Sequence, residues 1–329
     1  MVTSTGFLNF SYIGFLNFLK MKNFTLLGLF RLVAIWVVLL SLVCHTGFAQ
    51  IPDWKWQNPL PQGNDLRGIH GLGGSRFIAV GSYGTILINS PSGGRPVIVA
   101  SGTKRNLNSV CFADSLNGWA VGDSGTILYS SNGGHSWLSQ NSGSTYNLNK
   151  VFFFNSLVGW VAGDHGTILK TLNGGQSWQT YATSTLNNVL SVHFINEQVG
   201  LAGTKFGWLF KTTNGGQSWV PTTGGDPSGS NWKLDVRLFS PQVYVVLCGN
   251  GNIIRTTNGG LNWTITILSA SMSSMHFSDS LHGFIVGQNG QIAKTNDGGQ
   301  TWAEQTSGTR QILNSVYFDN NQNGWIASD

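Results

Sequence analysis

Residues 171–178 read Thr-Leu-Asn-Gly-Gly-Gln-Ser-Trp, and this octet decides the fold because it recurs along the chain. Four further copies end at Trp137, Trp219, Trp263 and Trp302, so that the five closing tryptophans follow one another at steps of 41, 41, 44 and 39 residues. A period of this length is typical of stacked supersecondary units and not of one irregular domain. The sequence therefore predicts a repeat protein.

One repeat predicts four short strands. The unit that closes at Trp178 has β-rich runs at 148–154, 159–163, 167–171 and 177–180, and residues that favour turns separate them. No stretch after the N-terminal leader shows helical periodicity over three turns. Each repeat is therefore expected to form one antiparallel four-stranded sheet.

A sheet of this size needs neighbours of the same kind to cover its apolar faces, and radial stacking in a β-propeller supplies them. The glycine-closed second strand occurs six times and begins again at Gly324. We therefore expect an all-β fold, a seven-bladed β-propeller of four-stranded antiparallel blades over residues 50–329, with six complete repeats and a truncated seventh. Residues 54–58 match 137–141 and are expected to be the outer strand of the seventh blade, to which residues 313–327 contribute two strands.

The first 49 residues predict export. An apolar run of 13 residues, 32–44, follows Met21, Lys22 and Arg31, and Ala49 offers a small residue for cleavage. This run is short for a membrane span, although a single anchoring helix is the alternative. We expect residues 1–49 to be an N-terminal extension plus a signal peptide that starts at Met21. The mature protein, with no membrane span, would be secreted, at the cell surface or in the periplasm.

Composition excludes one class of partner. Without Lys20, Lys22 and Arg31 the chain keeps 15 Lys and Arg against 13 Asp and Glu, so the mature protein is near neutral and nucleic acid is not an expected partner. The mature chain has two cysteines, Cys111 and Cys248, in apolar strands of distant blades, and we expect buried free thiols instead of a disulfide.

The octet itself predicts a hairpin turn between third and fourth strands. An Asn or Asp side chain can bond to the backbone two residues later, paired glycines permit positive φ, and the tryptophan packs over the turn. The predicted role is structural. It applies to Asn132, Trp137, Asn173, Trp178, Asn214, Trp219, Asn258, Trp263, Asp297 and Trp302.

This octet resembles the Asp-box, or bacterial neuraminidase repeat, although Asp297 alone keeps the aspartate of that motif. Combined with Gly-Asp-His-Gly-Thr-Ile-Leu-Lys-Thr at 163–171, the pattern resembles the photosystem II assembly and stability factor family over residues 54–329. The resemblance implies a β-propeller that acts as a chaperone-like scaffold for a protein partner. The Trp-Lys-Trp-Gln-Asn-Pro opening resembles secreted members from Bacteroidetes-type bacteria, which often end in a type IX secretion sorting domain.

Catalysis is the alternative, because sialidases and some glycoside hydrolases share the Asp-box. Sialidases need an arginine triad with an Arg-Ile-Pro signature, which this sequence lacks. Asp123 and Asp164 could form a carboxylate pair, but both occupy a repeated turn position where aspartate caps the turn. We expect no enzyme activity and no cofactor, and keep a glycan-binding or sialidase-like propeller as the second interpretation.

Three histidines raise the question of a metal site. His70, His193 and His276 share one first-strand position with Cys111, Phe152, Arg237 and Tyr317. Since they fall in the first, fourth and sixth blades, they need not converge, and packing between blades is preferred to metal binding.

Two sets of residues are candidates for partner binding. Lys170, Lys211, Arg255 and Lys294 share one third-strand position and would place positive charge along one side of the ring; the alternative is that they lie along the sheet. Loops leading into first strands and the second-to-third-strand turns carry specificity in many propellers. There we single out the insertion 221–232 with Trp232, together with Tyr146, Lys104, Arg105, Arg310, Tyr83, His165 and Phe206. The expected partner is another protein or a cell-surface component, with a glycan as the alternative.

Overall fold

The computed structural model describes residues 63–89, 95–222, 232–320 and 323–329 of the 329-residue chain. The chain divides into two compact units, Met1–Asp53 and Trp54–Asp329, and all described residues belong to the second. Their regular structure is β-strand, with three one-turn 3-10 helices at Ser82–Gly84, Asp123–Gly125 and Gln288–Gly290. None of the helices found in these ranges is long and apolar enough to cross a membrane. The predicted signal peptide lies outside the described residues.

Six four-stranded antiparallel sheets follow one another along the chain, and in each the strands pair in sequence order. The first two are β1 (Leu66–Gly73), β2 (Arg76–Gly81), β3 (Ile86–Ile88) and β4 (Val97–Ile98), then β5 (Leu107–Phe112), β6 (Gly118–Gly122), β7 (Ile127–Ser130) and β8 (Leu138–Gln140). The next two are β9 (Leu148–Phe153), β10 (Gly159–Gly163), β11 (Thr167–Thr171) and β12 (Gln179–Ala182), then β13 (Val189–Phe194), β14 (Gly200–Thr204), β15 (Leu209–Thr212) and β16 (Val220–Thr222). The last two are β17 (Lys233–Leu238), β18 (Tyr244–Cys248), β19 (Asn252–Thr256) and β20 (Thr264–Ile267), then β21 (Met272–Phe277), β22 (Gly283–Gly287), β23 (Gln291–Thr295) and β24 (Ala303–Thr306).

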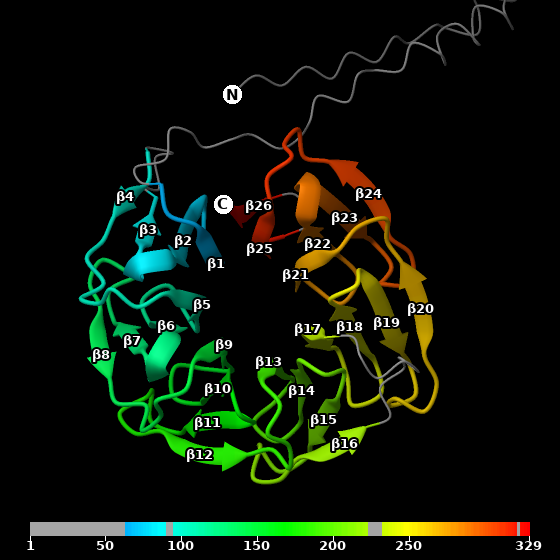
Figure 1. Ribbon diagram of the computed structural model, residues 1–329, viewed down its shortest axis with the longest axis horizontal. Helices are drawn as coiled ribbons and strands as arrows, with labels where there is room; N and C mark the ends of the chain where they lie inside the picture. The colour runs from blue at the N-terminus through cyan, green and yellow to red at the C-terminus, as the bar shows by residue number, and fades with distance from the viewer. Residues whose placement is uncertain (1–62, 90–94, 223–231, 321–322) are drawn as a thin grey trace, which may run out of the picture. The chain divides into compact units, whose positions relative to one another are not determined.

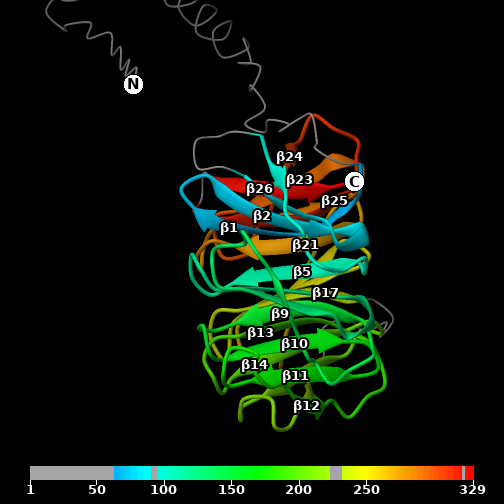
Figure 2. The same ribbon diagram turned by 90° about the vertical axis from the view of Figure 1, so that its left-hand side faces the viewer.

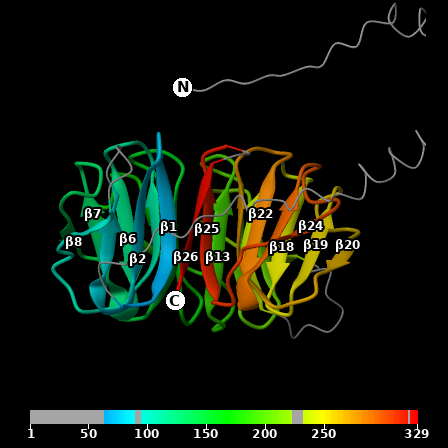
Figure 3. The ribbon, with the colours of Figure 1, turned by 90° about the horizontal axis from the view of Figure 1, so that it is seen from above.

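The sheets are the blades of a β-propeller. Figure 1 shows them arranged around a central axis, with the first strand of each blade innermost and the fourth at the periphery. Seen from the side in Figures 2 and 3, the blades form one ring of roughly uniform depth. The predicted all-β propeller is thus confirmed, and the observed strands β9, β10 and β11 match their predicted bounds to within a residue.

The expectation of seven blades is wrong, because the ring has six four-stranded blades. The seventh repeat contributes a two-stranded sheet, β25 (Leu313–Phe318) and β26 (Gly324–Ser328). No third or fourth strand pairs with it among the described residues, and the segment 54–58 that we expected as its outer strand lies outside them. The seventh repeat alone was therefore not sufficient to predict a seventh complete blade.

The two-stranded sheet nevertheless lies between the last and first blades, where β25 contacts both β21 and β1. The side-chain amide of Asn314 on β25 donates to the Leu66 carbonyl oxygen of β1 at 2.9 Å. Asn108 makes the same bond to Leu148 of the following blade, and Asn149 makes it to Val189, both at 3.0 Å. A bond repeated between consecutive blades thus also joins the end of the ring to its start.

The core lies between blades because each sheet buries both faces. Trp119 on β6 and Trp160 on β10 are fully buried, and their rings stack on Phe153 and Phe194 of the next blade, with ring centroids 3.5 and 3.6 Å apart. Burying an aromatic side chain of this size stabilises the fold by several kcal/mol, since truncation to alanine typically costs about 3–5 kcal/mol. Contact between neighbouring blades is therefore a major source of stability.

Candidate functional site

The five octets form the turns between third and fourth strands. In the turn at 171–178, the Asn173 side-chain oxygen accepts from the Ser177 N–H at 3.0 Å, and its amide donates to the Ser177 hydroxyl at 2.9 Å. Gly174 and Gly175 have φ of 67° and 83°, in the region that favours glycine. An asparagine thus closes the turn in the same way as an aspartate, which explains why four octets tolerate it.

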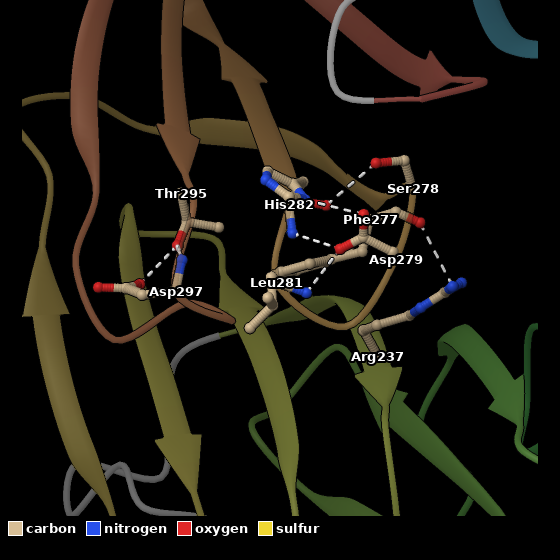
Figure 4. A network of polar contacts seen from close by, with 8 residues as sticks. All are labelled: Arg237, Phe277, Ser278, Asp279, Leu281, His282, Thr295 and Asp297. Atoms are coloured by element: carbon tan, nitrogen blue, oxygen red, sulfur yellow. Dashed lines mark hydrogen bonds and ion pairs between the residues drawn. The ribbon is translucent and has the colours of Figure 1, made fainter.

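The charged form of Asp297, in the fifth octet, is held by several donors. Its carboxylate accepts from the Thr301 hydroxyl at 2.6 Å and from the Thr295 hydroxyl at 2.8 Å, the latter drawn in Figure 4. Partial burial raises the pKa of Asp297, but the bonds from Thr301, Thr295 and the Gln300 N–H outweigh it and lower the pKa to about 2. Its contacts account for a turn, not a ligand site.

The four third-strand cations contact the ring itself. Lys170 is 9% exposed, and its Nζ donates to the Gly215 carbonyl oxygen in the next blade's octet at 2.9 Å. Arg255 donates to Gly298 at 3.0 Å in the same way. Lys211 donates to Pro241 at 2.8 Å, and Lys294 Nζ lies 5.2 Å from the ring centroid of Phe284. These contacts favour the alternative in which the cations pack along the sheets.

Asp123 and Asp164 are likewise engaged by their own turns. The Asp123 carboxylate accepts from the amides of Asn106 and Asn108 at 2.8 and 2.9 Å. Asn147 and Asn149 bond to Asp164 at 3.2 and 3.0 Å in the next blade. A structural role explains both carboxylates without a reaction.

The first strands lie innermost in the propeller, as Figure 1 shows. One repeated position on them, whose side chains contact one another between neighbouring blades, is called the central ring; it holds His70, Cys111, Phe152, His193, Arg237, His276 and Tyr317. The rings of His70 and His276 each lie 4.4 Å from Tyr317, centroid to centroid. The printed contacts of these histidines, such as His193 with Phe152 and His276 with Tyr317, join neighbouring blades, as expected for packing between blades. No group of three or more His, Cys, Asp or Glu side chains in the described ranges could hold a metal ion.

An ion pair crosses this central region. Lys150 of β9 lies 3.2 Å from the Asp235 carboxylate of β17, so it skips the intervening blade. The equivalent position of that blade carries the small Ser191, which leaves room for the lysine chain. The same carboxylate oxygen of Asp235 also accepts from the Met275 N–H at 3.2 Å. Three blades therefore meet at one buried carboxylate.

The central histidines are neutral at ordinary pH. Burial lowers the pKa of His70 to about 3. Burial, and next the charge of Arg237, lower the pKa of His193 and His276 well below the usual value. Each of these two rings accepts a backbone N–H at Nδ1, from Leu238 at 3.3 Å and from Phe318 at 3.2 Å. A neutral ring that accepts at Nδ1 carries its proton on Nε2, so both present a donor there.

The second-to-third-strand turns and the loops that enter first strands form one side of the ring, which we call the loop face. Backbone bonds join the two kinds of segment, as from the Gly125 N–H to the Tyr146 carbonyl at 2.7 Å and from Gly166 to Asn187 at 2.9 Å. The octets lie on the other side of the ring. There the Gly174 N–H donates to the carbonyl oxygen of Leu157, in the turn between the first and second strands. The predicted residues Lys104, Arg105 and Arg310 are exposed on the loop face.

Five exposed aromatic residues lie on the loop face of the third to fifth blades, while the predicted Tyr83, 73% exposed, lies on this face of the first blade. We call this set the aromatic arc. It comprises Tyr146, His165, Phe206, Trp208 and Trp232. Both Phe206 and Trp208, in one turn, have 53% of their surface exposed, and Trp232 has 45%. Trp208 was not singled out from the sequence, although its place beside the turn glycine Gly207 could have identified it.

The aromatic arc is held in place. Tyr146 and His165 stack with centroids 4.4 Å apart. His165 has a φ of 56°, an uncommon conformation for a residue other than glycine, and its N–H donates to the Asn188 side chain at 3.3 Å. The Asn188 carbonyl in turn accepts from the Lys205 N–H at 2.9 Å, and the Lys205 ammonium lies 4.7 Å from the Trp232 ring centroid. Costly exposure of aromatic surface on a fixed backbone is typical of binding sites.

The family profile of Photosynthesis system II assembly factor YCF48 matches residues 94–185 and 268–329. These two stretches of the chain are similar to the repeats of this assembly-factor family. Two solved structures of the factor share 17% identity with it. The one titled YCF48 bound to D1 peptide has a TM-score of 0.66, over 85% of this chain and 96% of that one. The other, from Cyanidioschyzon merolae, has a TM-score of 0.65, over 82% and 94%.

An enzyme has the same fold. The GH74 enzyme of Niastella koreensis aligns with a TM-score of 0.66 at 16% identity, over 82% of this chain and 52% of the enzyme. No curated protein matches the chain. At these identities, the structural likenesses to the assembly factor and to the enzyme show a shared propeller fold and nothing more.

Proposed function

We propose that this chain is a non-catalytic protein-binding module, an interaction or assembly scaffold that binds its partner through the aromatic arc of the loop face. The observation that carries the proposal is a set of large exposed aromatic side chains, of which Tyr146 and His165 stack on each other and Trp232 packs under the Lys205 ammonium. Tyrosine and tryptophan are the residues most enriched in the energetic centres of protein interfaces, and a rigid platform lowers the entropy cost of binding. The relative titled as bound to a D1 peptide is a precedent for peptide binding within the family.

Glycan binding is the second candidate, because exposed aromatic rings also stack on sugars and a GH74 enzyme shares the fold. Hydrolysis would need carboxylates that are free to exchange protons with a substrate. Asp123 and Asp164 are instead each held by two asparagine amides. This favours binding over catalysis.

A parallel screen distinguishes the two candidates. Peptides selected from a random library and a glycan array are both tested against the protein carrying residues 50–329. Selective peptide binding with a silent glycan array supports the proposal. Glycan binding that is lost in Trp208→Ala, or release of sugar from any oligosaccharide, would replace it.

We also propose that the protein is exported, on the evidence of the apolar run 32–44 after Met21 and of the small residue Ala49. Residues 21–49 fused to a leaderless alkaline phosphatase should yield activity in the bacterial periplasm. A matched fusion with Leu39→Arg should abolish it, because a charge interrupts the apolar run. Fusion protein that stays inactive in the cytoplasm in both cases rules out export by this segment.

A further inference from the structure

The central ring contains a buried cation without a matching anion. Arg237 of β17 donates through Nη2 to the Phe277 carbonyl oxygen of the next blade at 3.3 Å, as Figure 4 shows. Its Nε is buried and has no hydrogen-bond partner among the described residues. A buried guanidinium that lacks a partner for one of its donors is costly unless a ligand supplies one.

The nearest candidate for that partner is already engaged. Asp235 lies two residues before Arg237 on the same strand, and its charge acts on the arginine. However, one of its oxygens accepts from Lys150 and Met275, and the other from the Val236 N–H at 3.1 Å. Lys150 and Arg237 together therefore carry one more charge than Asp235 neutralises.

The two histidines beside Arg237 add donors. His193 and His276 are neutral and protonated on Nε2, as their accepting Nδ1 atoms require. Both lie near enough to Arg237 for its charge to lower their pKa. The Tyr317 hydroxyl, which can donate or accept, also acts on Arg237, and among the described residues Asp235 is the carboxylate whose charge acts on it. A site with an excess of positive charge and of donors favours a bound anion.

We infer that the central channel of this propeller binds a small anion, of the size of chloride or formate, at the Nε of Arg237 between the blades that carry His193 and His276. The close packing of the ring, with centroids 4.4 Å apart around Tyr317, leaves no place for a large ligand. Arg237 is half-buried as a residue, and its Nε is fully buried. This site is independent of the proposed function at the loop face.

The first test is the thermal stability of the full chain at constant ionic strength, with gluconate replaced stepwise by chloride or formate. Ligand that binds the folded state raises Tm, by about 5 °C at roughly a hundred times its Kd. Arg237→Met should abolish this rise. Arg255→Met is the matched control, because Arg255 also donates to the next blade but its Nε is already bonded to Gly298. A Tm in the wild type that is independent of the anion would overturn the inference, as would a rise retained in Arg237→Met.

The second test does not depend on a variant that folds. Crystals of the wild-type protein grown in bromide should show an anomalous peak within about 3.5 Å of Arg237 Nε, since bromide replaces chloride in such sites. Density for water alone at that position, or bromide bound elsewhere on the surface only, would contradict the inference.

Discussion

Most residues at a repeated position have the same role in every blade, although their chemical type differs between blades. Asparagine and aspartate close the octet turns equally well at Asn173 and Asp297, because the side-chain oxygen that accepts the backbone bond is common to both. The central histidines are a different case. They share a position that other blades fill with Phe152 or Cys111, and burial keeps them neutral. The residue type at a repeated position thus determines whether that blade's stability depends on pH.

Asp297 should make the fifth octet sensitive to acid. Its pKa is lowered to about 2, so its stabilising bonds are complete above the ordinary aspartate pKa and are lost as pH falls toward 2. We expect Asp297→Asn to match the wild type at pH 7 and to lose less stability between pH 4 and pH 2. Urea unfolding at both pH values measures this, and a parallel loss in the two proteins would contradict it.

His193 should destabilise the fold below neutrality. Because its folded pKa is well below that of the unfolded chain, unfolding takes up a proton once pH falls below about 6.5. The free energy of unfolding should fall with pH, and His193→Asn should reduce that slope by up to about 1.4 kcal/mol per pH unit. Denaturant titrations from pH 7 to pH 4.5 provide the slope. An unchanged slope would mean that His193 is protonated in the fold.

Strands of one blade are joined to the octet turn of the next blade by side-chain donors. Trp119 and Trp160 donate to Gly174 and Gly215 through their indole N–H at 3.2 and 3.0 Å. Arg255 makes the corresponding contact to Gly298, where the second strand carries Val245 instead of tryptophan. The third-strand cations and the second-strand tryptophans thus share one structural task.

Lys170→Met should therefore weaken the fold and leave partner binding intact. A charged donor to a buried carbonyl contributes about 1.5–3 kcal/mol, and the Trp160 bond to the same oxygen retains part of it, so we expect a loss of about 1–2 kcal/mol. Urea unfolding gives the loss, and the affinity for a selected peptide gives the control. If Lys170→Met kept the wild-type stability but lost affinity for the peptide, the third-strand cations would be a binding surface after all.

The repeat made strands and turns predictable, because local spacing determines them. β10 and β11 were predicted to the residue, whereas β12 starts at Gln179, since Ser177 and Trp178 still belong to the turn. The shared position of the central ring was recognised, but the Lys150–Asp235 pair was not predicted, because it depends on how close next-but-one blades come near the centre. The aromatic arc was predicted in part: Tyr146, His165, Phe206 and Trp232 lie on segments that spacing placed on one face.

Across the whole molecule, the ring is held both around its circumference and across its centre. Asn314 joins β25 to β1, and Lys150 reaches Asp235 two blades away. Closure was expected from a seventh blade, and the described residues of that repeat supply two strands between the last and first blades. A contact across the axis couples blades that do not touch as neighbours.

A double-mutant cycle measures that coupling. Lys150→Met leaves the buried Asp235 carboxylate without its cation, and we expect a loss of about 2 kcal/mol after allowing for the partial exposure of the lysine. Asp235→Asn should cost a similar amount, and the double variant should cost less than the sum by about 1–2 kcal/mol. If the losses of unfolding free energy in the two single variants added up to that of the double variant, the interaction between Lys150 and Asp235 would contribute nothing to stability.

Whether the aromatic arc binds a protein partner can be measured with one library-selected peptide, as its affinity for matched surface variants. Trp208→Ala should raise its Kd by about 30-fold or more, since truncating a central aromatic typically costs at least about 2 kcal/mol. Leu261→Ala, which truncates an 80% exposed side chain in an octet on the opposite face, should leave the Kd unchanged. Equal affinities for the wild type and Trp208→Ala, or a loss confined to Leu261→Ala, would contradict the account.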